Sequence, residues 1–400
     1  MNIVSVCESN PVFMPVQQEP VPAVIKVVGT GGGGSNAVNR MMERGLGGVQ
    51  FIAVNTDLQD LNNKSNAETK LQIGSRVTQG RGAGGKPEIG EEAANEDREA
   101  IAGVLRGSAM VFVTAGMGGG TGTGSAPVIA KTAKEQGALT VAVVTKPFDY
   151  EGRFKMKLAE EGIKKLRESV DTLIVIPNQH LFKLVERSTP LDQACHLADD
   201  VLRQGVQGIS DIITKTGMIN TDFADVESIM KGQGDALMGI GISSGENRAR
   251  EAAASAIDNP MLEDTSIDGA THILVNIAGP QDISLVEVDE VMNTIKSKAD
   301  PDVEIIYGVL YEPELENKIR ITVIATGFKA SSKVEGQKIE GRAKKEEDVI
   351  NFSEFERMRE QTTQKQRPDY LSQRNYSEDL DIPTLIREHN YQKIANGSNY

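Results

Sequence analysis

Five short runs of apolar residues, many of them β-branched, recur through the first half of the chain, at residues 23–29, 49–54, 109–115, 139–144 and 172–177. They show little alternation of polar and apolar positions, which is typical of strands buried on both faces of a parallel sheet. Helical spacing occurs between them; one such helix is predicted to bury Val128, Ile129, Thr132 and Ala133 and to end at Gly137. Strands that alternate with helices predict a doubly wound α/β domain over residues 23–190.

Residues 62–90 are polar, and we identify no regular element in them, whereas alanines and charges predict a helix at Glu91–Leu105. A long amphipathic pattern from Asp192 to Lys215 predicts a central helix, which at 1.5 Å per residue would span roughly 36 Å. Its expected buried side contains Cys195, Val201, Leu202, Ile209, Ile212 and Ile213. Gly205 and Gly208 on this helix would permit close packing on the first domain.

After the central helix, strand patterns at residues 236–243, 272–278, 303–311 and 318–326 alternate with helical patterns at 246–257 and 285–298. They predict a second, smaller α/β domain over residues 217–328, which the central helix at residues 191–216 joins to the first.

Both ends of the chain lack such patterns. Residues 1–22 are rich in proline and predict a flexible arm, and residues 329–379 are polar and charged, which predicts a disordered linker. An apolar island at residues 380–388 interrupts the polar tail, and residues 389–400 follow it. In this island Ile382, Leu385 and Ile386 could form an apolar stripe on folding against a partner, or could be incidental apolar residues.

Composition narrows the classes of protein. A formal net charge of -14 argues against nucleic acid or an anionic membrane as a direct partner, and the 4% aromatic content argues against base-stacking surfaces. The only cysteines, Cys7 and Cys195, lack metal-ligand spacing, and no apolar run reaches the length of a membrane span. We therefore expect a cytoplasmic protein in a reducing compartment, without direct membrane insertion.

The stretch Gly118–Gly124 reads Gly-Gly-Gly-Thr-Gly-Thr-Gly and lies between a predicted strand and a predicted helix. Ser125 is expected to cap that helix, with Pro127 in its first turn. Such a turn either binds a phosphate through its N–H groups and the helix dipole, or is a tight turn without a ligand. It contains no Walker-type lysine, so hydroxyl groups of Thr121 and Thr123 and a magnesium ion are expected to assist phosphate binding.

A second loop of this kind, Gly31–Asn36, follows the strand at residues 23–29, and a third glycine stretch lies at Gly82–Gly85. Asn55 and Asp57 lie at the end of the strand at residues 49–54, an edge of a parallel sheet where ligands bind. The second loop alone also fits a dinucleotide-binding oxidoreductase, but that class does not explain the threonine-rich loop.

Together these motifs resemble the FtsZ family of tubulin-like GTPases that act in bacterial division. The resemblance covers residues 23–328 and the island at 380–388, and its motifs occur in the family's order. They are Gly31–Asn36, Ala53–Asp57, Gly82–Gly85, Gly118–Gly124, Thr145–Phe148 with Glu151, and Asn220–Asp225. The resemblance implies a tubulin-like fold, with a GTP-binding domain joined by the central helix to a C-terminal domain that begins with a catalytic loop.

The resemblance also implies a set of nucleotide-binding residues. For GTP or GDP these are Gly32, Gly33, Gly34, Ser35, Asn36, Gly120, Thr121 and Gly122 around the phosphates, Glu151 and Lys155 at the ribose, and Asp199 at the guanine. Residues expected near the phosphates or Mg²⁺ are Asn55, Asp57, Ala83, Gly84, Gly85, Gly118 and Gly119. No specific metal ligand is assigned.

Three positions of this chain depart from the family's pattern. Lys155 stands where arginine is frequent, Cys195 where an aromatic residue commonly stacks on guanine, and Ser35 where many relatives have glycine. Ordinary structural interpretations also remain open. Glu151 and Lys155 could form a surface ion pair, and Asp199 with Asp200 could belong to a solvated helix face.

For hydrolysis the resemblance implies that Asn220, Asp222 and Asp225 act on the GTP of a neighbouring subunit in a head-to-tail filament. The alternative is that Asp222 and Asp225 only cap a helix that begins there.

The resemblance further implies that filaments form the cytokinetic ring at mid-cell. The island would bind membrane anchors and regulators through Asp381, Ile382, Pro383, Leu385 and Ile386. A tubulin-like regulatory GTPase not dedicated to division would share the nucleotide site but should lack the island.

Overall fold

The computed structural model describes residues 23–183, 185, 188–215, 217–259, 267 and 269–328, as well as the backbone but not the side chains of Leu191 and Cys195. The arm at residues 1–22, the linker at 329–379, the island at 380–388 and the tail at 389–400 lie outside the described residues. Those predictions therefore stay predictions.

The first part of the sheet is parallel, with strand order β3-β2-β1-β4-β5-β6. Its strands are β1 (Ile25–Thr30), β2 (Val49–Asn55), β3 (Thr69–Gln72), β4 (Met110–Gly116), β5 (Leu139–Lys146) and β6 (Thr172–Pro177). In register, Ile25 of β1 lies opposite Val49 of β2 and Met110 of β4. The strand order reverses between β1 and β4, which confirms the predicted doubly wound arrangement and places its switch point there.

The sheet continues in the order β7-β10-β8-β9, with β7 (Gly234–Ser244), β8 (His272–Gly279), β9 (Glu304–Tyr311) and β10 (Lys318–Thr326). β10 is antiparallel to both β7 and β8, whereas β9 is parallel to β8. β6 and β7 pair in parallel only from Thr172 to Ile174, and this short ladder joins the two parts into one ten-stranded sheet.

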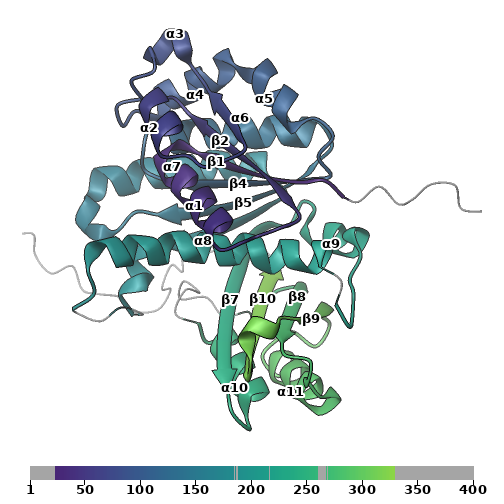
Figure 1. Ribbon diagram of the computed structural model, residues 1–400. Coiled ribbons are helices and arrows are strands. Elements are labelled where there is room, and N and C mark those ends of the chain that lie inside the picture. The colour runs from purple at the N-terminus through teal and green to yellow at the C-terminus, as the bar shows by residue number, and fades with distance from the viewer. Residues whose placement is uncertain are drawn as a thin grey trace, which may run out of the picture. The chain divides into compact units, whose positions relative to one another are not determined.

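Helices cover both faces of this sheet (Figure 1). They are α1 (Gly31–Glu43), α2 (Leu58–Asn63), α3 (Ser75–Thr78), α4 (Pro87–Glu96), α5 (Arg98–Leu105), α6 (Thr121–Glu135), α7 (Arg153–Ser169), α8 (Leu191–Thr214), α9 (Phe223–Met230), α10 (Arg248–Ile257) and α11 (Leu285–Lys296), with short 3₁₀ helices η1 (Asp149–Glu151), η2 (Asn178–Lys183) and η3 (Pro313–Leu315). α1, α8 and α9 enclose one hydrophobic core, α4 to α7 enclose a second on the other face, and α10 and α11 cover a third.

Three local predictions are corrected. Residues 62–90 contain β3 and α3, and the predicted helix at 91–105 divides into α4 and α5 at Asp97. α6 begins at Thr121, four residues earlier than expected, so the last residues of the glycine-rich stretch are helical. Ser125 is therefore inside α6 instead of capping it, and its hydroxyl donates to the Thr121 carbonyl (2.7 Å).

The long helix α8 lies against both parts of the sheet. Its buried residues include Val201, Leu202, Ile209 and Ile212, as predicted, while Ile213 is half-buried. A Cβ atom on Gly205 would lie 3.0 Å from Val143 Cγ1 of β5, and one on Gly208 would lie 2.7 Å from Thr322 Cγ2 of β10. Only Gly205 therefore packs on the first domain as expected, because Gly208 packs on the second.

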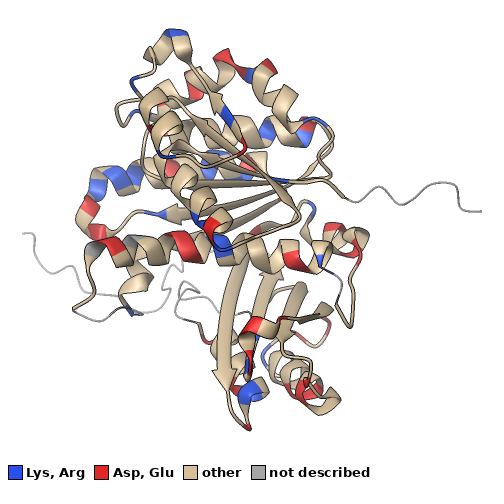
Figure 2. Ribbon diagram, in the orientation of Figure 1, with Lys and Arg blue, Asp and Glu red and all other residues tan. Residues whose placement is uncertain are grey.

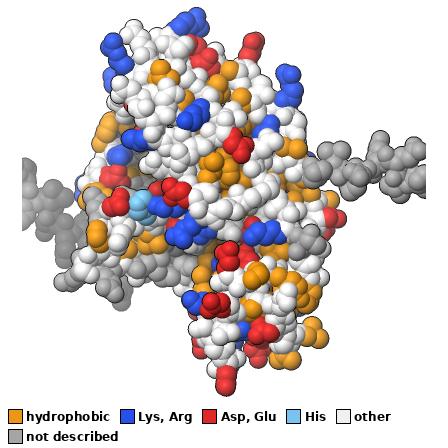
Figure 3. Space-filling model, viewed as in Figure 1, with side chains coloured by type: hydrophobic (Ala, Val, Ile, Leu, Met, Phe, Trp, Pro, Cys, Tyr) orange, Lys and Arg blue, Asp and Glu red, His pale blue; other side chains and the backbone are white. Residues whose placement is uncertain are grey.

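On the face shown in Figure 3, basic and acidic side chains of the described residues lie beside one another in several places. Ion pairs between described residues include Arg98 with Glu135 (2.5 Å) and Arg167 with Asp235 (2.7 Å). None of the helices in the described part of the chain is both long and apolar enough to cross a membrane.

Candidate functional site

A cavity of about 480 Å³ opens at the carboxyl ends of β1, β4, β5 and β6, where they meet the N-terminal half of α8. It is lined by Thr30, Gly31, Gly32, Gly33, Asn36, Gly116, Met117, Gly119, Gly120, Thr121, Gly122, Thr145, Pro147, Phe148, Tyr150, Glu151, Lys155, Asn178, Ala198, Asp199 and Leu202. The carboxyl edge at the switch point of a doubly wound sheet is where such proteins bind ligands. The cavity is therefore the candidate site.

The loop between β1 and α1 forms one wall. Gly31 has φ +68°, and a Cβ atom there would lie 2.8 Å from the Gly122 nitrogen, so this loop contacts the loop that begins α6. Gly32, Gly33 and Asn36, three of the predicted phosphate-binding residues, line the cavity.

Two residues of the same motif do not line the cavity. A Cβ atom on Gly34 would lie 2.4 Å from the Thr114 carbonyl oxygen of β4, and Ser35 is buried. Gly34 therefore lets α1 approach the sheet closely. The expected phosphate contacts of Gly34 and Ser35 stay predictions.

The loop between β4 and α6 forms the facing wall, with Gly119, Gly120, Thr121 and Gly122 at the cavity. Gly118 lies behind them at φ +97°, and a side chain there would meet the Lys155 carbonyl oxygen at 2.8 Å. α1 and α6 thus both direct their N-termini at the same cavity. The backbone N–H groups and the dipoles at the N-termini of both helices make the cavity suited to binding phosphate.

The two threonines of this loop have different roles. Thr121 lines the cavity, and its hydroxyl is 2.6 Å from that of Thr56. Thr123 is buried, and its Oγ1 accepts a hydrogen bond from the Gly118 N–H (2.8 Å). The expectation that Thr123 offers its hydroxyl to a ligand is therefore wrong, because this hydroxyl stabilises the loop from inside.

Glu151 and Lys155 both line the cavity and also pair with each other, at 2.5 Å between Oε2 and Nζ. Glu151 Oε1 accepts from the Phe148 N–H (2.8 Å), which fixes its carboxylate at the cavity wall. The ion-pair interpretation is thus confirmed, and it does not compete with a ribose contact because the pair lies at the site.

Aromatic residues after β5 and β6 surround this part of the cavity. Phe148 stacks on Tyr150 with ring centroids 5.1 Å apart and meets the edge of Phe182 at 5.5 Å. Phe148 and Tyr150 line the cavity and were not among the predicted site residues. Their signal in the sequence was position, since they directly follow a strand of the parallel sheet.

Asp199 lines the cavity from α8 and is half-buried, so it does not belong to a solvated helix face. Burial raises its pKa to about 6, while Arg40 and His196 oppose the shift. Asp200 on the same turn has other partners, because it accepts hydrogen bonds from Arg203 (2.7 Å) and Gln204 (2.5 Å). Asp199 is thus the carboxylate on α8 that is available to a ligand.

The predicted phosphate and magnesium environment at Asn55, Asp57 and 83–85 lies behind the wall. Asp57 Oδ1 caps α2 by accepting from the N–H groups of Gln59 (2.9 Å) and Asp60 (3.1 Å). Asn55 donates to Asp60 Oδ2 (2.9 Å). Within the described residues, no group of three or more His, Cys, Asp or Glu side chains could hold a metal ion.

The segment 83–85 packs against the back of Gly120, where a Cβ atom would lie 2.9 Å from Ala83 Cβ and 3.1 Å from the Gly85 nitrogen. None of these residues lines the cavity. Contacts of Asn55, Asp57, Ala83, Gly84 and Gly85 with a phosphate or Mg²⁺ therefore stay predictions.

The predicted catalytic residues lie elsewhere. Asn220, Asp222 and Asp225 are exposed beyond the C-terminal end of α8, and Figure 2 colours the acidic positions of the neighbouring α9 red. Asp222 and Asp225 form a capping box, with the Asp222 carboxylate accepting from the Asp225 N–H (2.8 Å). Asn220 Oδ1 accepts from the Gly217 N–H (2.6 Å). The capping interpretation is thus confirmed in a single chain, and it leaves these side chains facing solvent.

The cavity and this loop do not meet within one chain. The cavity borders α8 at Ala198, Asp199 and Leu202, and α8 ends at Thr214. Over the fifteen residue-to-residue steps from Asp199 to Thr214, the helix rises by about 22 Å. This separation is shorter than the full length of the helix, because the cavity is not at the first residue of α8.

Two family models match the chain. The GTPase domain of the Tubulin/FtsZ family matches residues 24–186, and the C-terminal domain of the FtsZ family matches residues 234–329. The first contains both glycine-rich loops, and the second contains β7 to β10.

Solved structures of tubulin-like proteins are similar to this chain. An empty FtsZ dimer from M. jannaschii is 48% identical with a TM-score of 0.73, and the match covers 77% of this chain and 89% of that one. CetZ1 from Haloferax volcanii, a GDP-bound monomer, is 22% identical with a TM-score of 0.67 over 77% of this chain and 95% of that one. CetZ2 from the same organism, a GTPγS-bound protofilament, is 20% identical with a TM-score of 0.64, covering 85% and 98%. The CetZ likenesses concern the fold alone.

Proposed function

The chain belongs to the tubulin/FtsZ family, and we propose that it polymerises head to tail into filaments in which each junction completes one GTPase site. Its GTPase domain binds GTP and GDP and hydrolyses GTP. The proposal concerns how hydrolysis is completed and what the filament does.

In the proposed site, the loops that begin α1 and α6 bind the phosphates through Gly32, Gly33, Gly120, Thr121 and Gly122. A Mg²⁺ ion bound with the nucleotide would neutralise phosphate charge, since neither loop contains a lysine for that task. The described residues contain no group of three or more His, Cys, Asp or Glu side chains that could hold such an ion, so it would be bound through the nucleotide.

The remaining parts of the nucleotide have matching groups. Glu151 and Lys155 contact the ribose hydroxyls. Asp199, when ionised, accepts hydrogen bonds from the N1–H and amino group of guanine, whereas adenine offers no such pair of donors. The carboxylate of Asp199 therefore selects GTP over ATP.

One observation carries the assembly proposal: the exposed carboxylates of Asp222 and Asp225 lie beyond the C-terminal end of α8, and that end is about 22 Å along the helix from Asp199 at the cavity. Stacking subunits head to tail would bring this loop over the γ-phosphate of the next subunit. There Asn220 and the two aspartates can orient and polarise the attacking water. A head-to-tail contact that does not close into a ring produces a filament.

The M. jannaschii FtsZ that this chain resembles is a dimer, which supports self-assembly as the mode of action. We further propose that the filament forms the cytokinetic ring at mid-cell in the cytoplasm. Residues 380–388 would recruit membrane anchors and regulators. The match to an FtsZ C-terminal domain favours this role over a regulatory tubulin-like GTPase.

The test is GTP turnover per subunit against protein concentration, with Mg²⁺, for the wild type and for Asp222→Ala. Turnover should rise steeply above a threshold in the wild type and should be absent in the variant, which still binds GTP. A rate per subunit that is independent of concentration, or normal hydrolysis by the variant, would show that one chain contains the complete site.

A further inference from the structure

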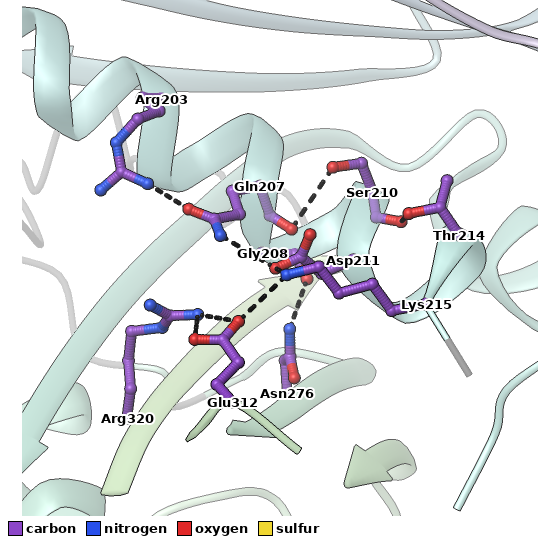
Figure 4. A network of polar contacts seen from close by, with 10 residues as sticks. All are labelled: Arg203, Gln207, Gly208, Ser210, Asp211, Thr214, Lys215, Asn276, Glu312 and Arg320. Atoms are coloured by element: carbon purple, nitrogen blue, oxygen red, sulfur yellow. Dashed lines mark hydrogen bonds and ion pairs between the residues drawn. The ribbon is translucent and has the colours of Figure 1, made fainter. Parts of the chain in front are cut away.

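The residue that joins α8 to the exposed loop makes ion pairs in two directions (Figure 4). Lys215 follows the last residue of α8, and its Nζ lies 2.9 Å from Asp211 Oδ2 on α8 and 3.2 Å from Glu312 Oε1. Asp211 is fully buried, and burial raises its pKa although Lys215 opposes the shift. Lys215 therefore links the central helix to the C-terminal part of the sheet.

Glu312, the second partner of Lys215, is held rigidly. It follows β9 directly, and its backbone N–H donates to the Gly279 carbonyl (2.8 Å). Arg320 of β10 donates from one nitrogen to both carboxylate oxygens of Glu312 at 2.7 Å each. The side chain of Glu312 is only 14% exposed, so Lys215 is bound to a group that cannot move far.

β9 also holds the loop itself. The Met218 N–H donates to the Val309 carbonyl (2.9 Å), and the Val309 N–H donates to the Ile219 carbonyl (3.1 Å). Thr221 Oγ1 donates to the Tyr307 carbonyl (3.3 Å). The loop therefore follows β9 from Met218 to Thr221 and reaches Asp222 from there.

From these contacts we infer that Lys215 and Glu312 are positioning residues that fix the position of the loop 217–222 relative to the end of α8. The inference rests on the proposed function, because it assigns the placement of Asn220 and Asp222 to this pair. An error of about 1 Å in placing a reacting group can lower a rate by roughly 100-fold. A change at Glu312, which does not line the cavity and lies outside the loop 217–222, should therefore act on turnover alone.

The experiment compares Glu312→Gln, Lys215→Met and Lys215→Arg with the wild type in the full-length chain. GTP affinity, sedimentation of polymer and turnover per sedimented subunit are measured for each. Glu287→Gln is the matched control, because Glu287 pairs with Arg248 at 2.7 Å with similar burial in the same part of the fold, away from this loop.

We expect Glu312→Gln and Lys215→Met to bind GTP within about twofold of the wild type, while turnover per sedimented subunit falls roughly 10- to 100-fold. Lys215→Arg should retain most of the turnover, because it keeps the charge between the two carboxylates. Hydrogen exchange of the Met218 and Val309 amides should be faster in Glu312→Gln, and amides of β1 and β4 should not change. Glu287→Gln should leave turnover and loop exchange unchanged.

Turnover of Glu312→Gln within twofold of the wild type, unchanged loop exchange, or an equal loss of turnover in Glu287→Gln would each overturn the inference. Asp222→Ala is measured beside these variants. If it hydrolyses GTP normally, the proposed function fails, and the exchange measurement alone still decides whether Glu312 holds the loop.

Discussion

The two ends of α8 differ in how their polar side chains are used. At the cavity end, Asp199 is half-buried and lines the cavity with the glycine-rich loops, and burial raises its pKa to about 6. At the loop end, Asp222 and Asp225 are exposed, and each accepts a hydrogen bond from the other's backbone N–H. The first end directs a carboxylate into a cavity, whereas the second presents carboxylates whose hydrogen bonds are made within their own loop.

Under the proposed mechanism, a single chain would bind the nucleotide without being equipped to cleave it. The carboxylates proposed to act at the γ-phosphate are exposed and are hydrogen-bonded within their own loop.

Asp222→Ser separates capping from chemistry at the loop end. Serine is about as good an N-cap as aspartate, so unfolding free energy should stay within about 0.5 kcal/mol of the wild type. Turnover should still fall by roughly 10²- to 10⁴-fold, because the carboxylate is lost. Chemical denaturation and phosphate release measure the two effects. A variant that remains active would reduce Asp222 to a helix cap.

Asp199→Asn tests the cavity end. The amide oxygen of asparagine could accept from only one of the two guanine donors, and the amide NH₂ would face the other and leave it unpaired. GTP affinity should therefore fall by about 10²- to 10⁴-fold. Xanthosine triphosphate has a carbonyl where guanine has its amino group, and it should bind this variant in place of GTP. Competition binding measures both nucleotides. Unchanged GTP affinity would remove Asp199 from base recognition.

Lowering the pH should weaken nucleotide binding because it protonates Asp199. Protonated Asp199 cannot accept both guanine donors, so with a pKa of about 6 affinity should fall up to tenfold per pH unit below that value and be constant above it. The unfolding free energy of the unbound chain should instead increase as the pH falls from 6 to 4. There the folded state binds more protons than the unfolded state, so this group destabilises the fold as the pH rises. The same titration of Asp199→Asn with GTP is the control, because the guanine base does not ionise in this range and the residual affinity should lack this pH dependence.

Lys155→Ala should have the smallest effect. Lys155 is 43% exposed and pairs with Glu151, so its loss should weaken GTP binding only about two- to fivefold, less so at high salt. Lys155→Arg should bind at least as well as the wild type, since guanidinium can donate to two oxygens. Affinity at low and high ionic strength checks this, and a loss beyond tenfold would give Lys155 a larger role than a ribose contact.

The strand pattern of the parallel sheet was predictable because buried parallel strands are nearly continuous in apolar residues. β3 was missed because Thr69, Lys70, Leu71 and Gln72 are exposed or half-buried at the edge of the sheet, where no apolar run is required. The start of α6 was misplaced because its first residues are glycines and threonines, which ordinarily predict a loop. Tertiary contacts hold this segment in a helix, as the Thr56–Thr121 hydroxyl contact does.

The site was predictable where position at a strand end coincided with a motif, as at Gly120, Thr121 and Glu151. Tyr150 was missed because an aromatic after a strand has no distinctive spacing, and Phe148, although part of the motif Thr145–Phe148, was not assigned to the site. Thr123 was assigned to the ligand because the sequence cannot show which of two neighbouring hydroxyls faces inward. Gly208 was assigned to the wrong domain because a glycine in a helix predicts close packing without naming the neighbour.

The most direct test of a site shared between subunits uses two chains and two nucleotides. The double variant Asp199→Asn/Asp222→Ser should bind xanthosine triphosphate but has a defective loop, whereas the wild type has an intact loop and does not bind that nucleotide. Neither alone should hydrolyse it, even with GTP present to support assembly. Mixed filaments should release phosphate from xanthosine triphosphate, because a wild-type loop then acts on the variant's cavity. Co-sedimentation of the two chains without this hydrolysis, or hydrolysis by the double variant alone, would contradict a site completed by the neighbouring subunit.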